Sequence, residues 1–111
     1  MSIYNPGRPH KYNPASGQGK KPPQLPGEYR IRDASGSIVY IGETCNLARR
    51  TREHIRTGKL QTSAKSASTI EYQIADSHST SHMRRIHERE KIAKHQPSLN
   101  RSAGGEGRVA N

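Results

Sequence analysis

The feature that most constrains this chain is a change of hydrophobic period between residues 27 and 54. Residues 29–33 alternate Tyr, Ile and Asp with arginines, and residues 38–42 form a short apolar run. A period of two with β-branched and aromatic residues predicts two strands. Gly36 lies between them, and glycine readily adopts the positive φ of a tight turn. The segment therefore predicts an antiparallel hairpin.

The register of this hairpin decides which side chains share a face. A two-residue loop at Ser35-Gly36 would pair Ile31 with Tyr40 and Tyr29 with Gly42. Because side chains alternate along a strand, Tyr29 and Tyr40 then point to the same face as diagonal neighbours. Gly42, opposite Tyr29, is expected to leave an open position on that face where a phosphate can approach. A slip of one residue would separate the two tyrosines.

After the hairpin, residues 46–57 follow a period near four, which predicts a helix. Asn46 is a favourable N-cap, and Gly58 is a favourable C-terminal stop. Leu47, Thr51 and Ile55 recur every four residues and are expected to form the buried stripe.

One flank of this helix is expected to carry Arg50 and His54, which are four residues apart. The arginine fork matches a phosphate better than lysine does. The candidate nucleic-acid contacts of the helix and its C-terminal end are Arg49, Arg50, Arg52, Arg56 and Lys59.

The second half of the chain predicts one more strand, at about residues 70–74, and a second helix at about 81–94. Ser79 or Thr80 would cap this helix, and Pro97 would end it. The predicted fold class is α/β (α+β), with a three-stranded, mostly antiparallel sheet flanked by two or three helices. The ordered domain is expected at 27–101, followed by a flexible tail at 102–111.

Residues 1–26 are rich in proline and glycine and contain no acidic residue and no periodic apolar pattern. This composition predicts a disordered or partly polyproline arm. The arm could tether nucleic acid nonspecifically through phosphate contacts, or it could be a solvated leader without a specific role.

The bulk charge indicates a polyanionic partner. The net charge is +10, hydrophobic residues make up 29% of the chain, and mean hydropathy is −1.04. Nucleic acid is the first candidate and an anionic membrane surface the second, although no apolar helix face supports a membrane. The single cysteine, Cys45, excludes an intramolecular disulfide and fits a reducing compartment. Without an apolar leader, a cytoplasmic location is expected.

Several short motifs follow one another along the chain at defined intervals. Gly27-Glu28-Tyr29 is followed by Tyr40-Ile41-Gly42, then by Arg50, His54, Glu88 and the ending Pro97-Ser98-Leu99-Asn100. This order resembles the GIY-YIG nuclease superfamily over residues 27–101. The departures are Glu28, where the family usually has an aliphatic residue, and Leu99, where an aromatic residue is common. Glu28 is expected to face away from Tyr29 and to remain solvated.

The resemblance implies a Mg²⁺-dependent endonuclease, with Mn²⁺ as a substitute, that leaves a 5′-phosphate and a 3′-hydroxyl. It implies that Glu88 binds the metal, that Tyr29 acts on the attacking water, and that Tyr40 and His54 assist. It also implies that Asn100 supports the site through hydrogen bonds. One carboxylate suffices for an ion that keeps most of its water shell. A nearby arginine and metal are expected to lower the pKa of Tyr29.

The substrate implied is DNA in preference to RNA, with low sequence specificity unless a partner protein or the arm supplies it. The alternative is a noncatalytic basic module that binds nucleic acid on the same scaffold. His78 and His82 are four residues apart, but no Cys pair or closed ligand set accompanies them, so zinc is not predicted. Cys45 is expected to be a small buried thiol rather than a nucleophile.

Overall fold

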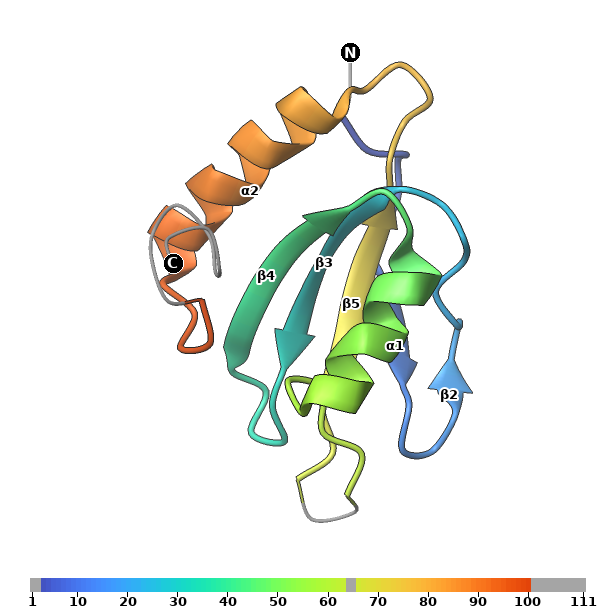
Figure 1. Cartoon of the computed structure of the whole chain (residues 1–111), viewed down its shortest axis with the longest axis vertical. Coiled ribbons are helices and arrows are strands. Elements are labelled where there is room, and N and C mark those ends of the chain that lie inside the picture. The colour runs from blue at the N-terminus through green and yellow to red at the C-terminus, as the bar shows by residue number, and fades with distance from the viewer. Residues whose placement is uncertain (1–2, 64–65, 101–111) are drawn as a thin grey trace.

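The computed structural model describes residues 3–63 and 66–100. The chain forms an α+β fold with a five-stranded antiparallel sheet in the order β2-β1-β5-β3-β4 (Figure 1). The elements are β1 (His10–Asn13), β2 (Gln18–Gly19), β3 (Gly27–Arg32), β4 (Ile38–Thr44), α1 (Leu47–Thr57), β5 (Thr69–Ile74) and α2 (Ser81–His95). The prediction of an antiparallel sheet with helices is confirmed. The predicted number of strands, three, is wrong, because the sheet has five. The predicted tail at 102–111 lies outside the described residues.

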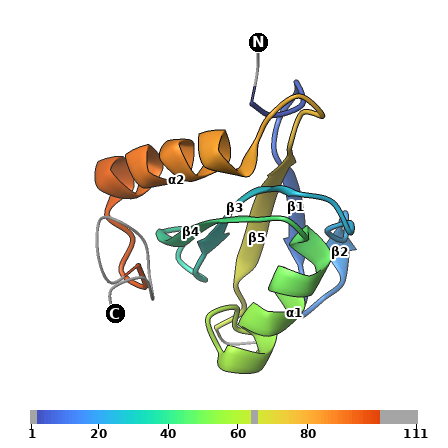
Figure 2. The ribbon, with the colours of Figure 1, turned by 45° about the horizontal axis from the view of Figure 1, so that its top comes forward.

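The two helices lie on opposite sides of the sheet (Figure 2). Helix α1 packs against β3, whereas α2 packs against β4 and β3. The core lies under α1 and consists of Tyr29, Ile31, Tyr40, Leu47, Leu60, Ile70 and Tyr72. No helix within residues 3–63 and 66–100 is long and apolar enough to cross a membrane.

The prediction of a disordered N-terminal arm is wrong. Strand β1 pairs with β5, and Tyr4 forms a bridge to Ala75 and is buried. The prolines do not prevent this packing, because a proline lacks the backbone donor but keeps its carbonyl acceptor. Pro23 accepts a hydrogen bond from Ala48 N at 2.9 Å, and Pro26 accepts one from Ala75 N at 2.8 Å. The segment therefore attaches through its backbone and through two isolated tyrosines, Tyr4 and Tyr12, which form no periodic apolar pattern.

The β3–β4 hairpin has the predicted register where it carries the tyrosines. Tyr29 pairs with Gly42 and Ile31 with Tyr40. The predicted two-residue loop is wrong, since Asp33 N donates to Ser37 O at 2.9 Å and a bulge follows Ile31. Gly36 has a φ of 92°, as the turn requires. The bulge compensates for the different loop, so both tyrosines still face the same side.

The predicted helix boundaries are close to those of the structure. The Asn46 side chain caps α1, and Gly58 ends it in the left-handed region. Thr80 caps α2, and Gln96 follows its last residue. The predicted buried stripe of α1 is wrong at its end, because Ile55 is 37% exposed and His54 is buried instead. A helix turns every 3.6 residues, so a step of three returns to the same face after a step of four.

The Cys45 thiol is exposed, contrary to the expectation that it is buried. It lies in the short connection between β4 and α1, where Arg49 Nη2 donates to its sulfur at 3.6 Å. A position in a connection leaves the side chain at the surface.

Candidate active site

Three aromatic side chains meet between the sheet and α1. Tyr29 comes from β3, Tyr40 from β4 and His54 from the last turns of α1. The Tyr29 hydroxyl lies 2.6 Å from His54 Nε2. The ring centroid of Tyr40 lies 6.0 Å from that of Tyr29 and 4.9 Å from that of His54. The hairpin register and the period of α1 thus bring together three residues that the sequence singled out.

Gly42 is needed because the phenol of Tyr29 crosses over it. A Cβ placed on Gly42 would come within 2.5 Å of Tyr29 Cζ and 2.9 Å of Cε1, which real structures do not tolerate. The expectation of an open position for a phosphate beside Gly42 is therefore wrong, since Tyr29 itself occupies it. The missing side chain lets the phenol reach across β4 toward the edge of the sheet.

Burial governs the protonation of Tyr29. Its side chain is 2% exposed, and burial, followed by the neighbouring Tyr40, raises its pKa well above the usual range. Arg50 opposes this shift but does not outweigh it. The expected lowering of the pKa is therefore wrong for the protein without metal. A neutral phenol can donate its proton to Nε2 of a His54 that is protonated on Nδ1.

Arg50 presents an unused donor beside the aromatic cluster. Burial alone would lower its pKa, but Tyr29 and Glu53 outweigh that effect and raise it, so the guanidinium stays charged. Its Nε lies 3.2 Å from Glu53 Oε1. The N–H does not point at that oxygen, and within the described part of the chain Arg50 Nε is a buried nitrogen without a hydrogen-bond partner. A phosphate oxygen would complete this site.

Glu88 and Asn100 cover the outer edge of β4. Glu88 Oε2 accepts from Glu43 N at 3.0 Å. Asn100 accepts from Ile41 N at 2.9 Å and donates to Ile41 O at 3.0 Å. Leu99 N also donates to a β4 carbonyl, at 2.7 Å. An unpaired strand edge is a liability, so these contacts protect the sheet as well as placing Glu88 near Tyr29.

A divalent cation at Glu88 would have this one carboxylate as its protein ligand. Glu43 is committed to Arg84, with Nε and Oε2 3.1 Å apart and the side chains 7% (Arg84) and 9% (Glu43) exposed. In residues 3–63 and 66–100 no group of three or more His, Cys, Asp or Glu residues is arranged to hold a metal ion. A single carboxylate with water and substrate oxygens is a donor set that suits Mg²⁺. The residues present would therefore suit an ion that keeps most of its water shell.

The predicted nucleic-acid contacts extend from this cluster along α1. Arg49, Arg52 and Arg56 are exposed. Lys59 follows the helix, with its Nζ 5.8 Å from the centroid of the Tyr40 ring. Glu53 lies among these arginines, 3.6 Å from Arg49 Nε and 3.2 Å from Arg50 Nε.

A second buried polar group lies on the opposite face of β3 and was missed by the sequence prediction. Glu28 is 8% exposed rather than solvated, although it does face away from Tyr29. Its Oε2 accepts from Tyr4 at 3.3 Å and from His87 Nδ1 at 2.7 Å. The charged residue in an otherwise aliphatic motif position was the available signal, because a buried carboxylate needs partners.

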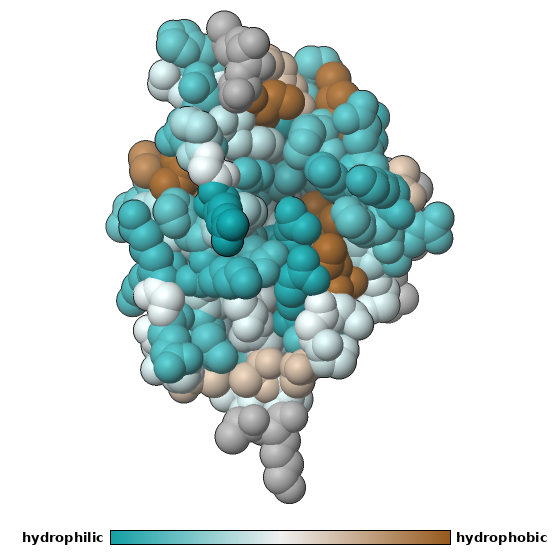
Figure 3. Space-filling model, turned by 180° about the vertical axis from the view of Figure 1, so that it is seen from behind, coloured by the Kyte–Doolittle hydropathy of each residue, from teal (hydrophilic) through white to brown (hydrophobic). Residues whose placement is uncertain are grey.

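The same back face carries a cluster of cations around one carboxylate. Glu71 lies 3.1 Å from Arg32, 3.6 Å from Arg30 and 3.9 Å from Lys11. Seen from behind, the surface is largely hydrophilic, with a few hydrophobic patches (Figure 3). The aromatic cluster and its unused donor lie on the other side, under α1.

Comparisons with known proteins agree with this arrangement. Residues 25–101 match the UvrC-like GIY-YIG domain family. The chain is 34% identical over 83 residues to the UvrABC system protein C of Trichormus variabilis and to that of Nostoc sp., covering 70% of this chain and 13% of each relative. The protein of the same name from Nitrosococcus oceani is 46% identical over 35 residues, 32% of this chain and 6% of that protein. The chain therefore spans a small part of these relatives' length.

Proposed function

This chain belongs to the UvrC-like GIY-YIG domain family of the GIY-YIG nuclease superfamily, and on that premise we propose that it is a metal-dependent endonuclease that cleaves DNA. The observation that carries the proposal is the direct contact of 2.6 Å between the Tyr29 hydroxyl and His54 Nε2. Next to this contact, the Nε–H of Arg50 makes no hydrogen bond within the described residues. Hydrolysis of a phosphodiester needs a proton acceptor for water and a cation at the phosphate, and these residues can supply both.

In the proposed reaction Tyr29 and His54 move the proton together. The raised pKa of Tyr29 makes a standing phenolate scarce at neutral pH. The Tyr29 oxygen can still accept a proton from the attacking water if its own proton passes to His54 Nε2 at the same time. Their separation lies within the reach that proton transfer requires. The pair acts as one general base.

Arg50 and Glu88 hold the phosphate and the metal. Arg50 donates its free N–H to a non-bridging oxygen, and its charge is secured by the acidic groups around it. Glu88 would hold Mg²⁺, or Mn²⁺ in its place, and the ion would supply positive charge beside the phosphate oxygens. The Glu88 carboxylate reaches this place because Glu43 N fixes one of its oxygens.

Tyr40 and Asn100 have supporting roles in the proposal. Tyr40 packs against both members of the proton-transfer pair and restricts their orientation. Asn100 holds Ile41, the residue between Tyr40 and Gly42. The basic surface of α1 contacts the phosphate backbone, which carries no sequence information, so intrinsic specificity is low. A partner protein would have to supply any higher sequence specificity. Residues 27–101 are the proposed nuclease unit.

The test is cleavage of supercoiled plasmid with Mg²⁺ or with EDTA. Glu88→Gln keeps an acceptor for Glu43 N but removes the charge, so we expect cleavage to be lost while DNA binding remains. Glu90→Gln removes the same charge from an exposed position of α2 and should cut normally. Binding that weakens with salt but never gives metal-dependent nicking would overturn the proposal in favour of a noncatalytic module.

A further inference from the structure

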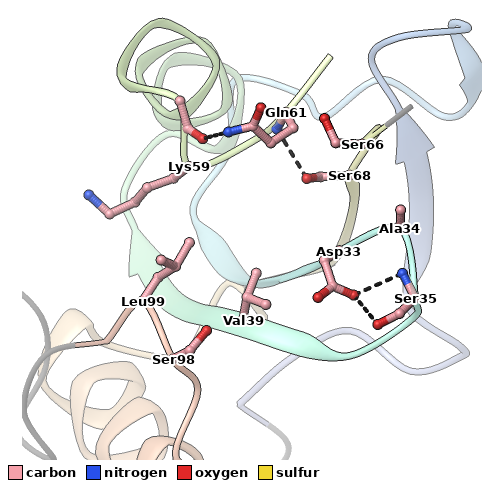
Figure 4. A pocket seen from close by; sticks show the side chains of 11 residues that line it. Asp33, Ala34, Ser35, Val39, Lys59, Gln61, Ser66, Ser68, Ser98 and Leu99 are labelled. Carbon is pink, nitrogen blue, oxygen red and sulfur yellow. Dashed lines mark hydrogen bonds between the residues drawn. The ribbon is translucent and has the colours of Figure 1, made fainter. Parts of the chain in front are cut away.

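A pocket of about 350 Å³ opens where three segments of the chain meet (Figure 4). The β3–β4 hairpin contributes Asp33 and Val39, the segment after α1 contributes Lys59 and Gln61, and the segment after α2 contributes Leu99. A volume of this order lies in the range of small-molecule sites, about 300–1,000 Å³. The pocket combines an aliphatic wall with polar and charged groups.

The pocket adjoins the proposed active site. Lys59 lines it and also lies over the ring of Tyr40, with its Nζ 5.8 Å from the ring centroid. Val39 precedes Tyr40, and Leu99 precedes Asn100, and the two lining residues are joined by the bond from Leu99 N to Val39 O at 2.7 Å. A nucleic-acid strand with its phosphate at Arg50 can therefore continue past Tyr40 into this pocket.

The two ends of the pocket carry opposite charge. Lys59 lies on the side of β4 and Leu99, and Asp33 lies across the cavity beside Ser35 (Figure 4). Ser35 Oγ, Ser35 N and Ser37 N all donate to Asp33 Oδ1, at 2.6, 3.0 and 3.0 Å. All three of these hydrogen bonds end on Oδ1 and none on Oδ2. These donors, Ser35 Oγ first, lower the pKa of Asp33, so its carboxylate is ionised at neutral pH.

We propose that this pocket takes the sugar and the unpaired base of the nucleotide next to the scissile phosphate, with Asp33 Oδ2 accepting from an exocyclic amino group of the base. The proposal rests on the proposed nuclease function. A carboxylate repels a phosphate but accepts a hydrogen bond from the amino group of cytosine or adenine. Val39 and Leu99 provide an apolar wall for the sugar and base, while Lys59 faces the phosphate. A base that enters this pocket together with its sugar has left the base stack, so the occupant must be single-stranded or extruded.

The test measures equilibrium binding of short oligodeoxycytidine and oligothymidine of equal length, in EDTA and at one salt concentration. Wild type should bind oligodeoxycytidine about fivefold to tenfold more tightly. In Asp33→Asn the amide oxygen can keep the three turn donors, and the amide nitrogen replaces the free acceptor with a donor. We therefore expect its preference to shift to thymidine, whose O4 is an acceptor.

Asp76→Asn is the matched control for charge. Asp76 also accepts from a following backbone N–H, that of His78 at 2.8 Å, but it does not line this pocket. The substitution should strengthen binding of both oligonucleotides equally. Equal affinity of wild type for the two, or an unchanged preference in Asp33→Asn, overturns the proposal.

A second pair of variants guards against a misfolded Asp33 variant. Ser98→Trp places an indole in the pocket and should abolish the base preference. Ser81→Trp makes the same change at an exposed position of α2 and should keep the preference. A preference that survives Ser98→Trp contradicts the proposal. Because binding is measured without metal, loss of plasmid cleavage would overturn the nuclease function alone, and the two failures remain distinguishable.

Discussion

Strand β3 carries one tyrosine–histidine arrangement on each face, and the two differ in what joins them. Under α1, Tyr29 contacts His54 directly at 2.6 Å. On the opposite face, Tyr4 and His87 do not share a hydrogen bond with each other but both bond to Glu28 Oε2, at 3.3 and 2.7 Å. An ionised carboxylate only accepts, so Glu28 fixes both of its neighbours as donors. In the direct pair no carboxylate fixes the roles, and the phenol of Tyr29 can donate to a neutral imidazole nitrogen.

The difference separates the pair proposed to transfer a proton, Tyr29 and His54, here called the reactive pair, from the structural group of Tyr4, His87 and Glu28. The carboxylate-centred group connects the N-terminal segment, β3 and α2, and His87 immediately precedes Glu88. It holds the helix that carries the proposed metal ligand. The direct pair holds no fixed charge of its own and lies beside a charged Arg50 with an unused donor. Similar residue types thus position a helix on one face and can move a proton on the other.

Tyr29→Phe breaks the reactive pair and should have the largest effect. The ring and its packing remain, but the shared proton is lost, so we expect the single-turnover cleavage rate to fall by about 10²–10⁴-fold. DNA binding should change little. Tyr4→Phe is the control on the other face and should cut at nearly the wild-type rate. Comparable rates for Tyr29→Phe and wild type would remove Tyr29 from the mechanism.

Gly42→Ala should displace the reactive pair without touching the structural one. The new Cβ would come within 2.5 Å of Tyr29 Cζ, so the phenol has to move away. Overpacking of this kind costs about 1–3 kcal/mol of unfolding free energy, measured by urea denaturation, and cleavage should fall with it. In a Tyr29→Ala background the stability cost should largely disappear. An equal cost in both backgrounds would show that the crossing of Tyr29 over Gly42 is not the cause.

Glu28→Gln tests the structural group. The amide keeps one acceptor but can no longer accept from both Tyr4 and His87 with a full charge, so we expect a loss of about 1–2 kcal/mol in unfolding free energy. The cleavage rate at saturating Mg²⁺ should fall much less than in Tyr29→Phe. Glu90→Gln, at an exposed position, should leave stability unchanged. A loss of cleavage as large as that of Tyr29→Phe would mean that Glu28 belongs to the reaction.

Alkaline pH should reveal what the two tyrosines share, and this effect is the smallest. Burial raises the pKa of both Tyr29 and Tyr4 above the usual value of about 10. A group with a raised folded pKa contributes stability that is present below its unfolded pKa and is lost as pH rises above it. Unfolding free energy should therefore decline above about pH 10, less steeply in Tyr29→Phe and in Tyr4→Phe than in wild type. Identical slopes in all three proteins would contradict this assignment.

The sequence predicts the reactive pair because its signals are local or lie in motifs. The period of two places Tyr29 and Tyr40 on one face, and the cap at Asn46 sets the phase of α1, so His54 reaches the same place. The exposed Ile55 shows the limit of that argument, since a strict period of four drifts from the true helical turn.

The structural group could not be predicted in the same way. Its members come from three segments that are distant in the sequence: the N-terminal segment, β3 and α2. Contacts between such distant segments leave no periodic hydrophobic pattern in the N-terminal segment. The strand β1 is short and carries few apolar residues, and its register with β5 places His10 beside Tyr72 and Lys11 beside Glu71, side-chain pairs that no periodic pattern announces. The charge of Glu28 predicts a solvated side chain. Its burial depends on Tyr4 and His87, which the sequence does not place beside it.

The covering of the β4 edge by Glu88 and Asn100 has a consequence for the history of such domains. A descendant that no longer cuts DNA would still need an acceptor for Glu43 N and an amide for Ile41, or its sheet edge would be open to pairing with other chains. Selection for solubility would then retain Asn100 and either Glu88 or a glutamine in its place after activity had disappeared. Under the proposed mechanism, the joint presence of Tyr29 and His54 is therefore a better marker of activity than a side chain at the place of Glu88 that can accept from Glu43 N.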